Sequence, residues 1–222
     1  MKYKKSEAKE YAREHMVGVW AANLTPFDAS LKLDEKAYRE NLNHWINELN
    51  LGGLFIAGKQ AEFFSMSLAE RKKLMELSVE VAHEAGNRNG KGQCGIVTSC
   101  SDTNLDVVLD LAKHSQDIGA DYVIVHSPVL HFGADTDDTI YEYYRYLSEK
   151  IDIGLAMWNH PDCGYVMSLE LCARIADLPN VVAIKYSTDR EKYKRLTEMV
   201  GHKIHVSNPD EPDWLENIIE LG

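Results

Sequence analysis

Two kinds of segment are missing from this 222-residue sequence: a long apolar run and an apolar leader. No stretch approaches the roughly 18 consecutive apolar residues that a membrane-spanning helix needs. The first residues, MKYKKSEAKEYAREHM, are charged and lack the apolar core of a signal peptide. We therefore expect a soluble, cytoplasmic protein with no membrane partner.

Cysteine is scarce, and the four thiols are Cys94, Cys100, Cys163 and Cys172. They form no C-x-x-C motif, and no histidine cluster lies at zinc spacing. A disulfide framework is not expected in a chain of this size and context. We predict four thiols that mainly fill the core, no metal site and no organic cofactor.

Basic residues are also in deficit, with 24 Lys and Arg against 35 Asp and Glu, so the net charge is −11. Such a surface repels a phosphate backbone, which excludes nucleic acid as an expected partner. Hydrophobic residues, in contrast, make up 45% of the chain. That share is enough for one sizeable core, and we predict a single domain over residues 1–222, with residues 1–16 as an N-terminal helical extension.

One pattern repeats along the chain: a short run rich in β-branched residues, a polar loop, and a helical stretch. Several runs are almost continuously apolar, which is typical of parallel strands covered on both faces. The predicted strands are 17–22, 53–57, 93–98, 122–126, 154–158, 181–186 and 203–207. Alternation of this kind predicts a parallel sheet covered by helices.

Two α/β architectures fit such alternation. A doubly wound sheet usually has a glycine-rich phosphate loop after its first strand, whereas the segment 23–27, NLTPF, contains no glycine. A (β/α)8 barrel of the TIM type fits better, although barrels need about 250 residues as a rule. Seven βα units can be counted, and the eighth is missing because the sequence stops at Gly222.

The helical stretches have recognisable faces and ends. In the segment 34–50, apolar side chains recur at Tyr38, Leu42, Trp45 and Leu49, which predicts one buried helical face. The segments 67–70 (SLAE) and 188–191 (TDRE) have the spacing of capping boxes, so we expect helices to begin there.

In a βα-barrel, the active site lies at the carboxyl ends of the strands. Among the residues at these ends, Lys185 follows four apolar residues in VVAIK. A lysine in such a place loses hydration of its ammonium form, which favours the neutral amine that attacks carbonyls. The alternative is an ordinary lysine that pairs with a carboxylate or extends to the rim.

Six motifs in chain order resemble those of the dihydrodipicolinate synthase and N-acetylneuraminate lyase family. Each lies near the carboxyl end of one of the predicted strands or just after it, and together they cover almost the whole chain. The segments are 25–27 (TPF), 58–62 (GKQAE), 127–128 (SP), 158–161 (WNHP), 184–185 (IK) and 207–210 (SNPD).

The resemblance implies a TIM barrel and a class I aldolase in which Lys185 forms a Schiff base with pyruvate or another 2-oxo acid. It also implies a homo-oligomer, a tetramer built from dimers, although the eighth unit and C-terminal helices that help assembly in the family are missing. The remaining strand-end residues become candidates for holding the substrate: Lys59, Gln60, Asn159, Ser127 and Asn208.

The departures from the family pattern are equally specific. Lys59 and Gln60 replace the threonines that hold the substrate carboxylate, although Lys59 can still bind it as a point charge. Trp158 stands where the family has its proton-shuttling tyrosine, and an indole N–H donates but takes up no proton. These changes argue against dihydrodipicolinate synthase itself. Candidates for a substitute shuttle are a bound water, His160, His131 and Tyr165.

Strand alternation places Tyr186, the neighbour of Lys185, on the opposite face of the sheet, so it is not expected to replace the tyrosine. The sequence thus predicts a lyase, an aldolase or hydratase-aldolase, with Lys185 and Trp158 at its reacting centre. Two alternatives are a ligand-binding relative without turnover and a truncated, inactive fragment of such an aldolase.

Overall fold

The computed structural model describes residues 1–86, 93–128, 137–208 and 211–221. Its centre is one sheet of parallel strands whose spatial order follows the sequence, from the first strand to the seventh. The strands are β1 (Trp20–Ala22), β2 (Gly53–Ile56), β3 (Gly95–Ser99), β4 (Tyr122–His126), β5 (Gly154–Asn159), β6 (Val181–Tyr186) and β7 (His205–Ser207). The seven predicted strands are all present, and two of them match residue for residue.

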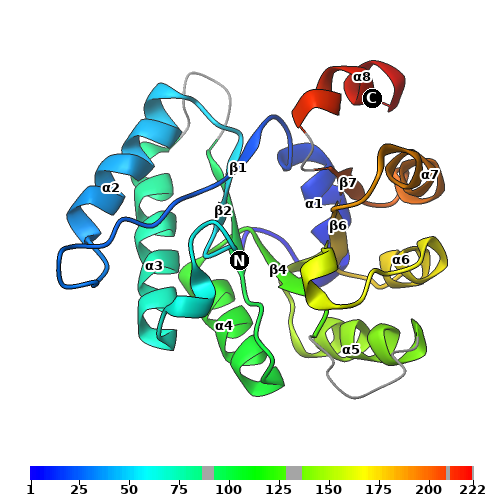
Figure 1. Ribbon diagram of the computed structural model, residues 1–222, viewed down its shortest axis with the longest axis horizontal. Helices are drawn as coiled ribbons and strands as arrows, with labels where there is room; N and C mark the ends of the chain where they lie inside the picture. The colour runs from blue at the N-terminus through cyan, green and yellow to red at the C-terminus, as the bar shows by residue number, and fades with distance from the viewer. Residues whose placement is uncertain (87–92, 129–136, 209–210, 222) are drawn as a thin grey trace.

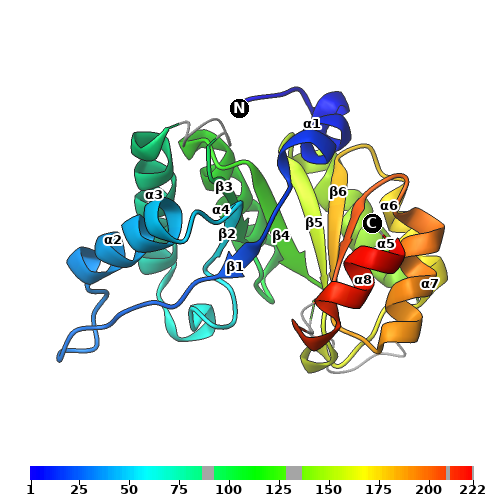
Figure 2. The same ribbon diagram turned by 90° about the horizontal axis from the view of Figure 1, so that it is seen from above.

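The sheet curls into a half-barrel, with helices along its outer side (Figures 1 and 2). Within the described residues, β1 and β7 form its two edges and do not pair with each other. The helices are α1 (Ala8–His15), α2 (Glu35–Asn43), α3 (Leu68–Ala85), α4 (Leu105–Ile118), α5 (Asp137–Lys150), α6 (Leu169–Ala176), α7 (Arg190–Val200) and α8 (Trp214–Leu221). Short turns of helix are η1 (Lys5–Glu7), η2 (His44–Glu48), η3 (Phe63–Ser65), η4 (Pro161–Cys163) and η5 (Glu211–Asp213).

Both faces of the sheet are apolar, for different reasons. The outward side chains of the strands, such as Leu54, Val125 and Ile184, pack against the helices in the main core. The inward side chains form a second, inner cluster, which also includes residues from α1. Its buried members are Ala8, Ala12, Phe55, Val97, Tyr122, Ile124, Ala156, Trp158, Val182 and Ala183.

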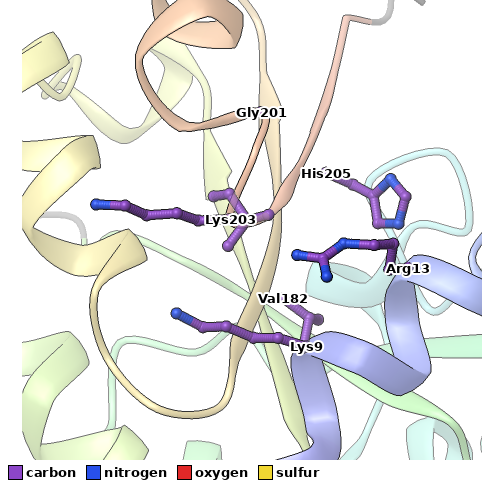
Figure 3. Close-up of a pocket in the computed structure, with 7 residues that line it drawn as sticks. Lys9, Arg13, Val182, Gly201, Lys203 and His205 are labelled. Carbon is purple, nitrogen blue, oxygen red and sulfur yellow. The ribbon is translucent and has the colours of Figure 1, made fainter.

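The short helix α1 lies on the inner face, against β5 and β6. Its small residues Ala8 and Ala12 are fully buried there. Two basic side chains of α1 form hydrogen bonds to neighbouring segments. Lys9 donates to the carbonyl of Ala176 at 2.6 Å, and Arg13 donates to the carbonyl of His202 at 3.2 Å. These side chains line a small cavity of about 30 Å³ (Figure 3). The charged N-terminal segment therefore covers part of the inner face of the sheet, at β5 and β6.

An indole covers the amino ends of the first strands. Trp20 pairs in register with Gly53, which in turn pairs with Gly95. A Cβ atom at Gly53 would lie 2.3 Å from the indole ring, and one at Gly95 would lie 2.4 Å from it. Glycine at both positions gives the ring the space to lie across the two strands.

Two predictions about helices were wrong in detail. The buried face expected for residues 34–50 does not continue past η2. This segment is a π-helical turn, which contains about one residue more than an α-helical turn and therefore rotates the following side chains. Ile46 is therefore fully buried in place of Trp45, and Leu49 is 54% exposed. The capping box at Ser67 is confirmed, whereas α7 is capped by Asp189, which accepts from the backbone N–H of Lys192.

Candidate active site

A row of four paired residues crosses the carboxyl ends of β4 to β7. His126 pairs with Trp158, Trp158 with Lys185, and Lys185 with Ser207. Residues in register on adjacent parallel strands share a face, and Trp158 belongs to the inner cluster. The four residues therefore point into the half-barrel at the edge of the sheet where barrels have their active sites.

Lys185 is half-buried and follows four buried residues of β6. Its ammonium nitrogen lies 5.2 Å from the ring centroid of Trp158, which is a cation–π contact. The structure thus brings together Lys185 and Trp158, the two residues that the sequence places at the reacting centre. The aromatic face replaces part of the hydration that the lysine loses.

Trp158 forms the wall of the site. It is 1% exposed, and the rings of Phe55 and His126 meet it edge to face, with centroids 5.0 and 4.2 Å away. Among the described residues, its indole N–H has no hydrogen-bond partner. A buried N–H of this kind is a donor for an oxygen atom in the site but accepts no proton.

The loop after β2 supplies the second cation of the site. Lys59 and Gln60 are exposed there, and the ammonium of Lys59 forms an ion pair with Asp162 in η4, which follows β5. The hydroxyl of Thr25 donates to the carbonyl of Ala61 at 3.1 Å, which joins the first loop to the second. The ion pair thus connects loops from strands that are far apart in the sheet.

Three predicted substrate-binding residues lie outside the row of strand ends. Asn159 pairs with Tyr186 on the outward face, and its side-chain oxygen accepts from the backbone N–H of Met167 at 2.8 Å. Ser127 is buried beside the hydroxyl of Tyr144 in α5. Asn208 is 8% exposed after β7. None of these three side chains therefore belongs to the inward row that includes Trp158 and Lys185.

The hydroxyl groups of the two tyrosines considered as proton carriers both form hydrogen bonds within the fold. Tyr165 donates its hydroxyl to the carboxylate of Asp137, and the hydroxyl of Tyr186 donates to the carbonyl of Met167 at 3.1 Å. Tyr186 therefore lies on the helix-facing side, as strand alternation predicts. His131 lies outside the described residues.

His160, in contrast, is near the site. Its Nδ1 accepts the backbone N–H of Asp162 at 3.2 Å, so its ring proton is on Nε2 when the ring is neutral. Burial lowers the pKa of His160, and the charges of Lys59 and Lys185 lower it further. The contact with Asp162 brings His160 to the residue whose carboxylate pairs with Lys59.

His126 is the residue that the sequence analysis missed. Burial, followed by His160, Lys59 and Lys185, lowers its pKa to about 4. Its Nδ1 lies 2.8 Å from the sulfur of Cys163, whose own pKa is raised to about 11 by burial. Side chains alternate along a strand, so if Tyr122 points inward, His126, four residues later in DYVIVHS, points inward too. This count would have found His126.

The described part of the site is rich in cations and has one carboxylate, that of Asp162. The same two lysines lower the pKa values of both histidines. Such a potential favours a small anion. Among the residues described, no group of three or more His, Cys, Asp or Glu side chains is arranged to hold a metal ion. None of the described helices is both long and apolar enough to cross a membrane.

Comparison with known proteins matches residues 15–222 to the dihydrodipicolinate synthetase family. The chain belongs to this family. An uncharacterised DapA-like lyase of Thermococcus kodakarensis is 31% identical over 81% of this chain, and the N-acetylneuraminate lyase of Clostridium perfringens strain SM101 is 27% identical over 88%. Both of these relatives are named as lyases.

The fold agrees with solved structures of the family. CdNal from Clostridium difficile in complex with mannosamine has a TM-score of 0.82 at 21% identity, and dihydrodipicolinate synthase from Aquifex aeolicus has 0.78 at 21%. Those matches cover 92% and 90% of this chain but 67% and 65% of those chains. The match to the Thermococcus kodakarensis lyase spans 58% of its length.

Proposed function

We propose that this chain carries the site of an aldolase or hydratase-aldolase that acts on pyruvate or another 2-oxo acid through an imine on Lys185. One observation carries the proposal: Lys185, the penultimate residue of an otherwise buried strand, points into the half-barrel against the face of Trp158. An amine at this place is shielded by apolar walls and remains open to a small ketone. No organic cofactor is required by this chemistry.

The reaction follows from the position of the amine. The neutral Lys185 nitrogen adds to the keto carbon to give a carbinolamine, whose hydroxyl group takes up a proton from solvent and leaves as water, and a protonated imine remains. The imine withdraws the electron pair of an adjacent bond, which allows that bond to break or form. The carboxylate of the 2-oxo acid then lies in a site whose cations include Lys59, which can hold it as a point charge.

Trp158 has a supporting role in this scheme. Its ring stabilises the positive charge of the imine through the same cation–π contact that it makes with the ammonium. Its buried N–H can donate to an oxygen of the bound substrate. Gln60 is exposed on the same loop as Lys59 and adds a neutral donor there, whereas we assign Ser127, Asn159 and Asn208 to the support of the loops.

Borohydride reduction in the presence of pyruvate tests the proposal. The imine is reduced to a stable adduct, which mass spectrometry of peptides should locate on Lys185. Lys185→Ala should abolish the adduct, while Lys192→Ala, a substitution of an exposed lysine on α7, should leave it intact. Retention of the full adduct in Lys185→Ala would show that another amine reacts.

A ligand-binding relative without turnover is the second candidate. One observation in its favour is that the ammonium of Lys59 already forms an ion pair with the carboxylate of Asp162. In addition, Trp158 stands where the family has a residue that carries a proton. Pyruvate that binds, as measured by calorimetry, but forms no borohydride adduct would favour this candidate. Three further expectations stay predictions. They are that the chain is a truncated fragment of such an aldolase, that it forms a dimer or tetramer, and that it is cytoplasmic.

A further inference from the structure

We propose that His126, positioned by Cys163, is the base that moves a proton at the carbon next to the imine. This inference rests on the function proposed above, because the proton in question exists only on a Lys185-bound 2-oxo acid. It fills the gap left by Trp158, whose indole takes up no proton.

Position is the first support. His126 is the last residue of β4 and belongs to the same inward row as Lys185, with only Trp158 between them. Its ring meets the indole of Trp158 edge to face at a centroid distance of 4.2 Å, and the nitrogen of Lys185 lies 5.2 Å from the centroid of the same indole. A substrate attached to Lys185 would therefore lie beside the indole that the imidazole also contacts.

The contact with Cys163 orients the ring. The sulfur lies 2.8 Å from Nδ1 and 3.4 Å from Nε2, so Nδ1 is the nitrogen that it engages. We assign the ring proton to Nδ1, with the sulfur as its acceptor, which leaves the lone pair of Nε2 for the substrate. His160 has the reverse arrangement, since its Nδ1 accepts a backbone N–H and its Nε2 carries the proton.

Burial and charge together determine the basicity of the ring. The groups that face His126 are Lys59, Lys185, His160 and Cys163, and burial, followed by the charges of His160, Lys59 and Lys185, lowers the pKa of the ring and keeps it neutral. In the step, the C3–H bond of the imine breaks and its proton goes to Nε2. The C–H electron pair forms the C2–C3 double bond, and the C–N π pair returns to nitrogen, giving a neutral enamine.

The positive charge thus moves from the Lys185 nitrogen to His126, and the number of cations in the site stays constant. The charge on the Lys185 nitrogen, one of the influences that oppose protonation of the ring, disappears in the same step that delivers the proton. Cys163, held as a neutral thiol by burial, adds no charge of its own. It acts as a positioning residue for the imidazole.

Exchange of the methyl hydrogens of pyruvate for deuterium measures this step directly. Proton NMR in D2O gives the exchange rate, which is divided by the amount of protein that borohydride traps as the Lys185 adduct. Failure of the wild type to form any adduct would overturn the proposed function, whereas an adduct without any exchange would overturn the role of His126 alone.

His126→Asn should lower the exchange rate per trapped site by about 100-fold, the usual size of a general-base contribution. Cys163→Ala should lower it by about tenfold, and Cys163→Ser, which keeps a polar atom for Nδ1, should restore most of the rate. His114→Asn replaces a histidine on the outer helix α4 and should change nothing. His126→Gln provides a second variant if His126→Asn does not fold.

A fall of less than tenfold in both His126 variants would overturn the assignment. So would an equal loss in Cys163→Ala and Cys163→Ser, because the thiol would then have a role other than orienting the ring. Loss of exchange in His160→Asn combined with normal exchange in His126→Asn would assign the base to His160 instead.

Discussion

At the scale of single residues, His126 couples the site to the stability of the fold. The pKa of an unfolded histidine is about 6.5, and in the folded chain that of His126 is lowered to about 4. Between these values the unfolded state binds more protons, so the free energy of unfolding falls as the pH drops through this window. The full effect is on the order of 3 kcal/mol.

We therefore predict that His126→Asn makes stability less dependent on pH. Urea unfolding at about pH 7 and about pH 4.5 should show a smaller loss in the variant than in the wild type. Burial lowers the pKa values of His160 and His83 as well, but these contribute equally to both proteins. Identical losses in the two proteins would show that His126 protonates normally in the folded state.

The pair of Lys59 and Asp162 gives a second prediction about single residues. Both side chains are about half exposed, at 43% and 51%, so the ion pair contributes little to stability. Asp162 nevertheless competes with a substrate carboxylate for the ammonium. Asp162→Asn should tighten pyruvate binding up to about fivefold, equivalent to less than about 1 kcal/mol.

Titration of adduct formation against pyruvate concentration measures this change. Lys59→Met should weaken binding, and the double variant should resemble Lys59→Met, because Asp162 acts through Lys59. Weaker binding in Asp162→Asn would mean that its carboxylate orients the lysine for the substrate. Thermal melting should shift little in either case.

At the scale of elements, α1 is fitted closely to the inner face of the sheet. Ala12 is fully buried against the inner cluster, whereas Glu14 of the same helix is exposed. Ala12→Leu should destabilise the fold by about 1–3 kcal/mol through overpacking. Glu14→Leu should change stability by less than about 0.5 kcal/mol.

Urea unfolding of the two variants gives the comparison. Because α1 contacts β5 and β6, a shift of the helix should also reach the strands that carry Trp158 and Lys185. Adduct formation by Ala12→Leu should therefore decrease along with its stability. Equal stability of the two variants would show that α1 does not depend on the sheet for its place.

At the scale of the whole molecule, apolar surface remains uncovered beside the open edge of the sheet. Three side chains of α8 are largely exposed: Leu215 at 69%, Ile218 at 66% and Ile219 at 74%. β1 and β7 also end the sheet without pairing with each other, and unpaired edges invite association. We predict that this 222-residue chain, expressed alone, self-associates or aggregates.

Sedimentation velocity and thermal melting test the prediction. Ile219→Lys should reduce association, while Glu198→Lys, on an exposed position of α7, should not. Both variants add a lysine, and Glu198→Lys changes the net charge by more, but only Ile219→Lys removes an apolar side chain. A monodisperse monomer that melts cooperatively above about 60 °C, which is high for a mesophilic domain, would contradict the prediction.

The sequence by itself determined the strands, their parallel alternation with helices and the strand end that carries Lys185. These features depend on local patterns: buried strands read as apolar runs, and a lysine that interrupts such a run is visible without a partner. The opposite orientation of Tyr186 followed from the two-residue period of a strand. The π-helical turn at His44–Glu48 was not visible, because its apolar residues fit an ordinary helix equally well.

Only the tertiary structure decided which strand ends meet. His126 and Cys163 are 37 residues apart in the chain, and Lys59 and Asp162 belong to different loops, so no spacing predicts either pair. The pairing of Trp158 with Lys185 depends on the register between β5 and β6, which shifts between Leu155 and Ala156. Registers and loop contacts are long-range properties of the packed sheet, and side-chain periodicity within one segment does not contain them.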